Sequence, residues 1–228
     1  MNTQKSFYFF VKRCIDILLS LMVILVFAPL LIPIIIALKL TAEGKILYGQ
    51  ERVGYKNKRF KIWKFATMLQ NSPNIGTGDI TLRNDPRVTP VGKYLRMTKL
   101  NELPQVFNVL FGDMSLVGPR PLMPVSFEYY PQQVQHVVYN SVPGITGIGS
   151  LVFRDEEKLV SEQTEMSHRD FYRYRIYPYK GELEMWYQQH KNLWTDVVII
   201  FLTAYSILFK KNNLVYKVFN DLPVNPFN

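Results

Sequence analysis

The sequence contains a single cysteine, Cys14, among 228 residues. One cysteine excludes an intrachain disulfide, and it also excludes the paired spacings of zinc sites and of thioredoxin-type redox motifs. We therefore expect a reducing, cytosol-facing location. The chain also lacks internal repeats and low-complexity tracts. Its 48% hydrophobic content supports a folded core, arranged as one large domain or two small ones.

Negative charge is scarce as well, because 18 acidic residues stand against 27 lysines and arginines. The net charge of +9 predicts an anionic partner, such as nucleic acid, a phosphorylated ligand or lipid headgroups. A basic and aromatic segment, from His168 to Arg175, suits either single-stranded nucleic acid or anionic lipid. We expect lipid and no nucleic acid, because the same chain carries a membrane segment.

Charge is missing altogether from Ile17 to Leu38, a run of 22 residues. As a straight helix this run would be roughly 33 Å long, enough to cross a hydrocarbon core of about 30 Å. It is too long for a cleaved signal peptide, and no small-x-small cleavage pattern follows it. The sequence therefore predicts insertion into a membrane.

Pro29 and Pro33 interrupt this hydrophobic run. Neither has an N–H, so the carbonyls of Leu25 and Pro29 lose their helical partners, and we expect a bend near the middle. Basic residues flank the run on both sides, Lys12 and Arg13 before it and Lys39 and Lys45 after it. The charge bias therefore gives no direction. Two interpretations remain open, a helix that enters the membrane and returns, and a kinked helix that spans it.

A second apolar run, Val197 to Phe209, has only 13 residues and ends at two lysines. It is too short to span a membrane as a helix, and is either a core helix or an interfacial one. Three aromatic residues precede it and suit either interface anchors or a buried helix face: Trp186, Tyr187 and Trp194.

The region between these two runs reads as a soluble domain. Lys45 to Gln50 and Arg59 to Phe65 predict two strands of a hairpin around a turn at Gly54 to Lys58. Val91 to Met97 and Leu103 to Phe111 predict helices. Further expectations concern connections: Asn71 to Pro90 is a long loop, and the Pro-rich segment from Leu222 to Asn228 is loosely held.

Asn101-Glu-Leu-Pro-Gln105 is the first candidate for chemistry. Pro104 suits the first turn of a helix, so we expect that helix to begin near Asn101, with Asn101 as its N-cap. Glu102 would then lie near the positive end of the helix dipole, where unpaired N–H groups favour anions. Ordinary helix capping explains the same two residues without any function.

Gly112-Asp-Met-Ser-Leu-Val-Gly-Pro-Arg-Pro121 is the second candidate. Arg120 stands between Pro119 and Pro121, which restrict the backbone around it, and arginine binds phosphate through two parallel hydrogen bonds. Glu102 or Asp113 could hold a hard cation such as Mg²⁺. Together these residues predict a site for phosphoryl transfer.

Several ungapped motifs now occur in a fixed order: Lys12-Arg13-x-x-Asp16, Gln50-Glu-Arg-Val-Gly54, Lys64-Phe65, Asp85-Pro-Arg-Val-Thr-Pro-Val-Gly92, Leu95-Arg96, Glu102-Leu-Pro-Gln105, the segment from Gly112 to Pro121, and Pro143-Gly-Ile-Thr-Gly147. This order resembles the bacterial sugar transferases, which are monotopic polyprenyl-phosphate phosphoglycosyl transferases. The resemblance covers about Lys12 to Leu208. The short chain looks like the minimal form of the family.

The resemblance implies a reaction and a place. A sugar 1-phosphate moves from a UDP-sugar to undecaprenyl phosphate and UMP is released, with Mg²⁺, at the cytosolic face of the bacterial inner membrane. It also implies that the amino-terminal helix is re-entrant. The expected fold is α+β, with a helix-break-helix membrane segment (residues 1–42), a small and mostly helical cytosolic domain that contains the hairpin and interfacial amphipathic helices (43–209), and a tail (210–228).

By the same resemblance, Glu102, Asn101 and Asp113 are the candidate catalytic residues, and Glu102 is the candidate Mg²⁺ ligand. The candidate substrate-binding residues are Lys64, Arg87, Arg96, Pro119 and Arg120. The sequence does not name the sugar, nor does it choose among capsule, O-antigen, exopolysaccharide and glycoprotein assembly. Segments 142–152 and 71–83 are candidate sugar-facing segments. We expect a homodimer, since twofold dimers are the commonest oligomers.

Two departures from the family pattern matter. Asn101 stands where the family's nucleophilic aspartate is expected, and a carboxamide is a poor nucleophile. Ala66 stands where many relatives have arginine. Three hypotheses remain: an active enzyme in which Glu102 is the nucleophile or a Mg²⁺ ligand that supports direct attack by the lipid phosphate, a non-catalytic relative that binds nucleotide sugar or a partner enzyme, and a basic membrane-surface module.

Overall fold

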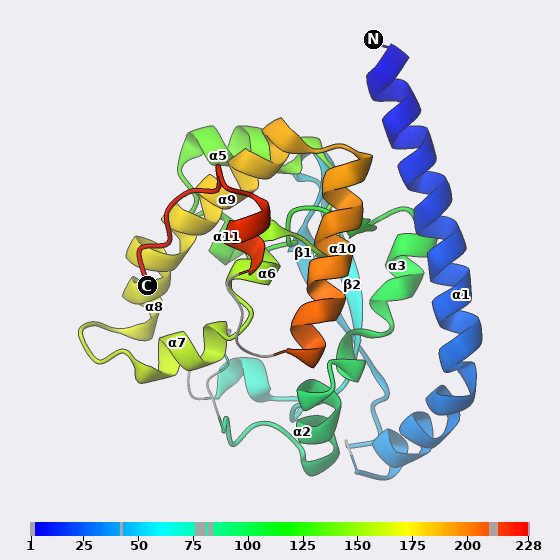
Figure 1. Ribbon diagram of the computed structural model, residues 1–228. Coiled ribbons are helices and arrows are strands. Elements are labelled where there is room, and N and C mark those ends of the chain that lie inside the picture. The colour runs from blue at the N-terminus through cyan, green and yellow to red at the C-terminus, as the bar shows by residue number, and fades with distance from the viewer. Residues whose placement is uncertain (1–2, 42, 76–80, 82–83, 210–213, 228) are drawn as a thin grey trace.

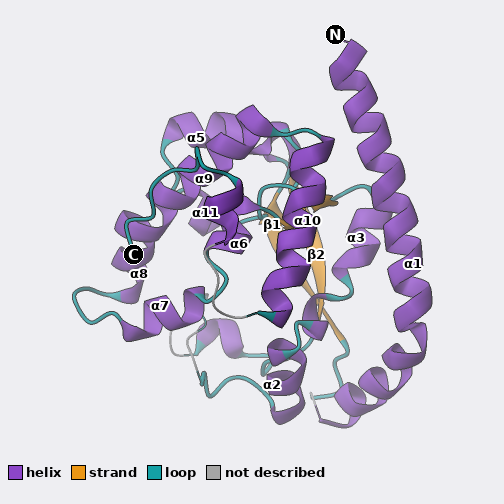
Figure 2. Ribbon diagram, in the orientation of Figure 1, coloured by secondary structure: helices purple, strands orange, loops and turns teal. Residues whose placement is uncertain are grey.

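The computed structural model describes every residue except 1–2, 42, 76–80, 82–83, 210–213 and 228. A long amino-terminal helix stands beside a body of shorter helices, and the body encloses two small sheets (Figures 1 and 2). The mixed and mostly helical architecture agrees with the expected α+β class.

Helix α1 runs from Thr3 to Thr41 and contains both Pro29 and Pro33. Its carboxyl-terminal part turns away from the line of the first part (Figure 1). The helix is nevertheless continuous, so the expected break into two helices is wrong. It bends because each proline lacks the N–H that would donate one helical hydrogen bond, while the other backbone hydrogen bonds of the helix remain. Within the described chain, α1 is the single helix that is long and apolar enough to cross a membrane.

The hairpin is confirmed, with β1 at Leu47–Val53 and β2 at Arg59–Phe65. The strands pair antiparallel, and Tyr48 lies opposite Lys64. The turn between them contains a short 3-10 helix, Tyr55–Asn57. The first strand begins two residues later than expected and ends three residues later, because pairing continues to the turn.

Helix α2, Pro90–Met97, matches the expected helix, and the Thr89 side chain caps it by accepting a hydrogen bond from the Gly92 amide. Helix α3 covers Gln105–Phe111 and packs between β2 and α1. It begins later than expected because a separate 3-10 turn, Leu100–Glu102, comes before it.

A parallel pair of three-residue strands, β3 (Ser115–Val117) and β4 (Gly144–Thr146), is a feature that the sequence did not predict. Short helices fill the rest of the body: α4 (Pro124–Phe127), α5 (Gln132–Val137), α6 (Ile148–Val152), α7 (Glu156–Glu162), α8 (His168–Phe171) and α11 (Leu214–Val218). Further 3-10 turns lie at Ser72–Asn74 and Val138–Asn140.

The largest core cluster surrounds α9 (Tyr177–His190) and α10 (Leu193–Leu208), and a π-helical turn, Tyr172–Ile176, leads into α9. Trp186 and Tyr187 are buried there, whereas Trp194 is exposed. The carboxyl-terminal segment joins the same cluster through Leu222 and Phe227. The expectation that this segment is loosely held is therefore wrong, because its apolar side chains have a core to enter.

Helix α10 contains nearly all of the short apolar run, and one of its faces is part of the core. Val198, Ile199 and Leu202 are buried, whereas Val197 and Phe201 on another face are exposed. It is therefore a core helix that also presents an apolar outer face.

Helix α1 is fastened to the body by polar side chains near its start. Asp196 of α10 accepts hydrogen bonds from Tyr8, Lys12 and Tyr187. The guanidinium of Arg13 donates to two carbonyls at the end of α3. Lys12 and Arg13 therefore bind protein groups, and they are not simply flanking charges of a membrane segment.

Candidate functional site

A cavity of about 1670 Å³ lies between the hairpin, α2, the 3-10 turn at Leu100–Glu102, the segment around Arg120 and residues 151–158. Charged side chains line much of it, among them Arg52, Lys64, Arg96, Glu102, Arg120, Glu156 and Lys180. A cavity of this size, walled by apolar and charged groups, can hold a nucleotide-sized ligand.

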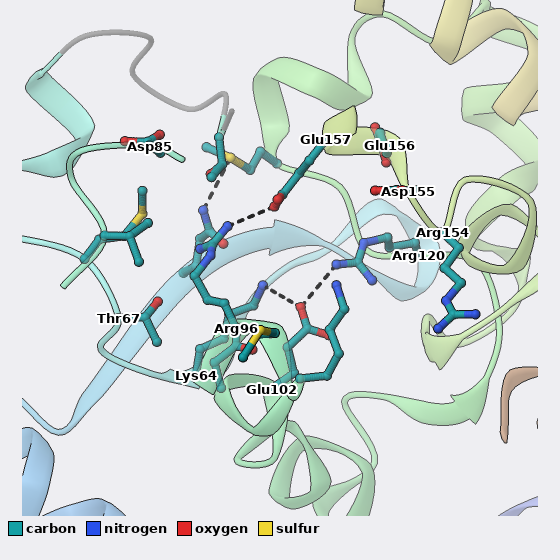
Figure 3. A pocket seen from close by; sticks show the side chains of 18 of the residues that line it. Lys64, Thr67, Asp85, Arg96, Glu102, Arg120, Arg154, Asp155, Glu156 and Glu157 are labelled. Carbon is teal, nitrogen blue, oxygen red and sulfur yellow. Dashed lines mark hydrogen bonds and ion pairs between the residues drawn. The ribbon is translucent and has the colours of Figure 1, made fainter. Parts of the chain in front are cut away.

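Glu102 is the centre of the charged cluster. Its Oε1 atom lies 3.2 Å from the ammonium of Lys64 and 3.3 Å from a guanidinium nitrogen of Arg120. Figure 3 shows both cations pointing at this one carboxylate from different elements. The Glu102 side chain is 21% exposed, so it still faces the cavity.

Electrostatics within the cluster favour an anion. Burial alone would raise the pKa of Glu102, but Lys64 and Arg120 outweigh it and hold that pKa well below its usual range. Burial lowers the pKa of Lys64 to about 8, even though Glu102 opposes the shift. Burial, together with the nearby Arg120, also lowers the pKa of Arg52 to about 10. One carboxylate thus pairs with two cations while Arg52 lies in the same cavity, and this excess of positive charge suits phosphate.

The hairpin supplies two of these cations. Lys64 lies across from Tyr48 in the strand pairing, and both residues line the cavity. Arg52 projects into the same cavity and donates a 3.1 Å hydrogen bond to the carbonyl of Pro121. The strands therefore set the spacing of Lys64 and also attach the hairpin to the segment that carries Arg120.

Arg120 follows a point where two backbone segments, 117–119 and 144–146, pass very close to each other. The Gly118 amide donates to Thr146 at 3.0 Å, and the Gly144 amide donates to Pro119 at 2.9 Å. A Cβ atom at Gly144 would lie 2.1 Å from the Gly118 nitrogen, so no side chain fits there. Pro119 itself is buried and braces this crossing, and it is not among the residues that line the cavity.

Asn101 and Glu102 lie on the 3-10 turn that follows Lys99, which has a positive φ of 60°. Asn101 lines the cavity and is 7% exposed, and within the described chain its Oδ1 atom has no hydrogen-bond partner. The expectation that Asn101 caps α3 is wrong, because this turn separates it from a helix whose N-cap is Pro104. The pair is therefore presented to the cavity by a turn and not by a helix end.

The structure separates the remaining candidates. Arg96 lines the cavity and pairs with Glu157 at 3.1 Å. Arg87 is buried and binds Asp85 and two carbonyls of the 72–75 turn, so its contacts organise the loop beside the cavity. Asp113 is exposed beyond the far end of α3 and does not line the cavity.

Both candidate sugar-facing segments touch this region. Leu151 and Val152, within 142–152, line the cavity. Ser72 and Thr81, within 71–83, also line it, although residues 76–80 and 82–83 lie outside the described chain. Both segments therefore border the cavity in the part of the chain that the structure describes.

Sequence reasoning missed several lining residues. Arg52 belongs to the motif Gln50-Glu-Arg-Val-Gly54, and strand alternation from Tyr48 through Gln50 could have placed it on the Lys64 side. Tyr172 and Arg169 come from the basic and aromatic segment that suggested nucleic acid or lipid. Lys180 lies inside α9 and forms a double contact of 2.7 Å with Glu156. No local pattern predicts it, since the pair forms through the tertiary fold.

Among the described residues, no group of three or more His, Cys, Asp and Glu side chains could enclose a metal ion. Glu102 nevertheless fits Mg²⁺, because this ion is usually held by one or two carboxylates together with substrate phosphates. The donor set therefore suits a metal that a phosphorylated substrate helps to bind.

Comparison with known proteins agrees with the motifs. The model of the family described as "Bacterial sugar transferase" matches residues 7–210. The undecaprenyl-phosphate galactose phosphotransferase of Salmonella typhimurium is 35% identical over 222 residues, which cover 91% of this chain and 42% of that protein. The UDP-glucose:undecaprenyl-phosphate glucose-1-phosphate transferase of Escherichia coli is 35% identical over 199 residues, covering 86% and 39% of the two chains.

The chain thus spans less than half the length of these relatives. The exopolysaccharide production protein ExoY of Rhizobium meliloti is closer in size. It is 30% identical over 216 residues, which cover 89% of this chain and 87% of that protein. The family match over most of the chain and these relatives show that the chain belongs to the bacterial sugar transferase family.

Proposed function

We propose that this protein transfers a sugar 1-phosphate from a UDP-sugar to undecaprenyl phosphate and releases UMP. The names of its relatives state this type of transfer for galactose and glucose. The observation that carries the proposal is the excess of cations around Glu102, where Arg52, Lys64 and Arg120 meet in one cavity. Such a cluster lowers the cost of bringing two phosphorylated substrates together.

The reaction exchanges one phosphorus–oxygen bond for another. An oxygen of the lipid phosphate bonds to the β-phosphorus of the UDP-sugar, and the bond from that phosphorus to the oxygen it shares with the α-phosphate breaks. UMP leaves with this oxygen, and the sugar remains on a lipid diphosphate. Lys64 and Arg120 offset the negative charge of the two substrates, while Glu102 keeps these two cations in place.

Mg²⁺ is part of the proposal. Glu102 would be its protein ligand, and the ion would supply further neutralisation of phosphate charge. Lys64 and Arg120 could then turn from the carboxylate toward the substrate phosphates.

Direct attack by the lipid phosphate is the route that we propose. Asn101 borders the cavity where its relatives are expected to carry aspartate, and its amide cannot form the phosphoryl-enzyme of a covalent route. Its amide group can instead hydrogen-bond a phosphate. Glu102 is held strongly ionised by its two cations, which makes it a weak base and a good organiser of charge.

Turnover is the first test. The protein in nanodiscs would receive undecaprenyl phosphate, Mg²⁺ and, in turn, UDP-glucose, UDP-galactose and UDP-N-acetylgalactosamine, the donors indicated by its relatives. We expect UMP release with at least one of them. If no UDP-sugar is turned over while the protein still binds UDP, a non-catalytic nucleotide-sugar binding protein replaces the proposed enzyme.

The route is tested by trapping. With UDP-sugar labelled in the β-phosphate and no lipid acceptor, direct attack leaves the native protein unlabelled. Stable label on the native protein would argue for Glu102 as nucleophile. The Asn101→Asp variant provides the comparison, because an aspartate at this position could accept the phosphoryl group.

We also propose that α1 enters the cytosolic face of the inner membrane and returns to it. Its bend and its largely exposed apolar surface support this placement. Single cysteines at Ser6 and Lys39, in a Cys14→Ser background, would be treated with an impermeant maleimide. Re-entry protects both positions in intact spheroplasts and exposes both in inverted vesicles, whereas a spanning helix leaves one position reactive from outside. Homodimer formation would be measured on the same samples by mass photometry.

A further inference from the structure

Two side chains from outside the charged cluster face the backbone of Arg120, one at its carbonyl and one at its amide. The hydroxyl of Tyr139 donates a 2.9 Å hydrogen bond to the Arg120 carbonyl. The same hydroxyl accepts a 2.9 Å hydrogen bond from the amide of Leu122. One phenol thus bridges the two peptide groups that flank Pro121.

Tyr139 is itself fixed. It lies in the 3-10 turn Val138–Asn140, is 1% exposed, and its ring stacks on Phe127 with a centroid distance of 5.6 Å. A buried tyrosine can be replaced by phenylalanine with little change of shape, so burial alone does not require the hydroxyl. The role of the hydroxyl is therefore in its two hydrogen bonds to the backbone around Arg120.

Glu184 approaches the same residue from α9. It is 2% exposed, and the Arg120 amide faces its carboxyl group closely enough to favour the charged form of that group. The carboxyl lies so close to Gly149 that a Cβ atom there would be 2.6 Å from Oε1. Among the described residues, its Oε2 atom has no hydrogen-bond partner. A buried carboxyl that is only partly satisfied costs stability, which points to a use other than stabilising the fold.

Glu184 can act in this way without a charge. Burial raises its pKa to about 8, although the Arg120 amide and Lys180 oppose the shift, so the group is mostly protonated at neutral pH. A neutral carboxyl still has an oxygen that accepts the Arg120 amide hydrogen. The carboxamide of glutamine offers the same acceptor with nearly the same shape.

We propose that Tyr139 and Glu184 are positioning residues for Arg120. Together they fix the carbonyl and the amide of this residue, which lie in the two peptide units on either side of its Cα atom, so that the guanidinium reaches the phosphate-binding side of the cavity beside Glu102. The two prolines limit the backbone torsions around Arg120, and these two hydrogen bonds select the direction in which its side chain leaves. This inference rests on the proposed function of the cavity as a phosphate site.

A double-mutant cycle tests the coupling to Arg120. The variants are Tyr139→Phe, Arg120→Gln and the double variant, each assayed for UDP affinity by calorimetry and for UMP release. We expect Tyr139→Phe to weaken UDP binding and kcat/KM by about tenfold, the loss of one positioning hydrogen bond. In the Arg120→Gln background the same change should have an effect of less than about twofold, because no guanidinium remains to be positioned.

Tyr130→Phe is the matched control. Tyr130 belongs to the same buried cluster as Tyr139, and within the described chain its hydroxyl makes no hydrogen bond to the Arg120 peptide unit. We expect it to keep UDP affinity and turnover. If Tyr130→Phe weakens UDP binding as much as Tyr139→Phe, or if the Tyr139→Phe and Arg120→Gln effects multiply, a general packing role replaces positioning.

Glu184 is tested by conservative rescue. Glu184→Gln should retain UDP affinity within about twofold, whereas Glu184→Leu should lose about tenfold, since leucine cannot accept the amide hydrogen. Equal losses in both variants would overturn the role of Glu184.

The outcome also separates this inference from the proposed function. Coupled losses of UDP affinity without any turnover would support positioning and reject the transferase. If the protein turns over UDP-sugar but the Tyr139→Phe and Arg120→Gln effects are independent, the transferase is supported and the positioning role is rejected. A wild-type protein that binds no UDP would overturn both.

Discussion

Glu102 and Asp196 are two carboxylates that each gather several donors, yet their surroundings differ. Asp196 is 6% exposed, and its two oxygens share three donors from fixed helices, Tyr8, Lys12 and Tyr187. Glu102 is more exposed, faces a large cavity, and receives Lys64 and Arg120 on a single oxygen. A carboxylate with satisfied oxygens and rigid partners joins elements, whereas one with surplus cations beside open space can exchange partners with a ligand.

Glu102→Gln should have the largest effect on turnover. The amide would no longer hold Lys64 and Arg120 by charge, and would be a poor ligand for Mg²⁺, so we expect UMP release to fall about 1000-fold. The thermal midpoint should change less than in Asp196→Asn, because Glu102 borders the cavity. A Glu102→Gln protein that keeps more than a tenth of the wild-type rate would place the chemistry elsewhere.

Asp196→Asn should have the largest effect on stability. Loss of the charge leaves Lys12 partly buried without its ion pair, and breaking such a pair costs about 3 kcal/mol. For a chain of this length, that corresponds to a decrease of roughly 6 to 12 °C in the thermal midpoint. Below the midpoint, turnover per folded molecule should stay near the wild-type value. Tyr8→Phe removes one donor of the same group, and should lower the midpoint by a smaller amount.

The charge of Lys64 should make kcat/KM depend on pH. Since burial lowers its pKa to about 8, the ammonium loses its proton above that pH in the free enzyme. We expect kcat/KM to decrease about tenfold per pH unit above pH 8, while it changes little between pH 6 and 7.5. Lys64→Arg should move this decrease to higher pH, since arginine keeps its charge. Glu184 has a pKa of about 8 as well, so the Glu184→Gln variant is the control. If its kcat/KM still decreases above pH 8, the titrating group is not Glu184.

Asp113→Asn should have the smallest effect. Asp113 is exposed, lies beyond the end of α3, and does not line the cavity. We expect UMP release to change by less than about twofold, and the thermal midpoint by less than about 1 °C. Substitutions of exposed residues usually have effects of this size. A loss comparable to that of Glu102→Gln would restore Asp113 as a catalytic residue.

Much of the fold follows from local sequence signals. The two prolines in the apolar run predicted the bend in α1, although not its continuity. Short apolar runs on either side of the turn at Gly54 to Lys58 predicted the hairpin. Helix α2 was also predicted, and its cap at Thr89 lies next to it in the sequence. By contrast, β3 and β4 are three residues long and far apart in the sequence, and they pair only through the tertiary fold. No periodicity can indicate such strands.

The site was predictable in part for a similar reason. Lys64, Arg96, Glu102 and Arg120 stand in ordered motifs, and all four line the cavity. Arg87 and Asp113 stand in the same motifs, yet one organises a loop and the other is exposed. A motif records which residues occur together, but not which way each side chain points. Lys180 and Glu184 lie in α9 without a motif, so they could be found only from contacts between distant segments.

The attachment of α1 to α10 also sets an order of events during synthesis. Lys12 and Asp196 are 184 residues apart. At about 5 to 20 residues per second, α1 therefore leaves the ribosome roughly 10 to 40 s before its partner exists. During this interval α1 can already pack on α3, whose carbonyls bind Arg13, whereas Tyr8 and Lys12 still lack their carboxylate partner. Arrival of α10 then supplies Asp196, so this second attachment of α1 forms only after the segment that carries Asp196 has been made.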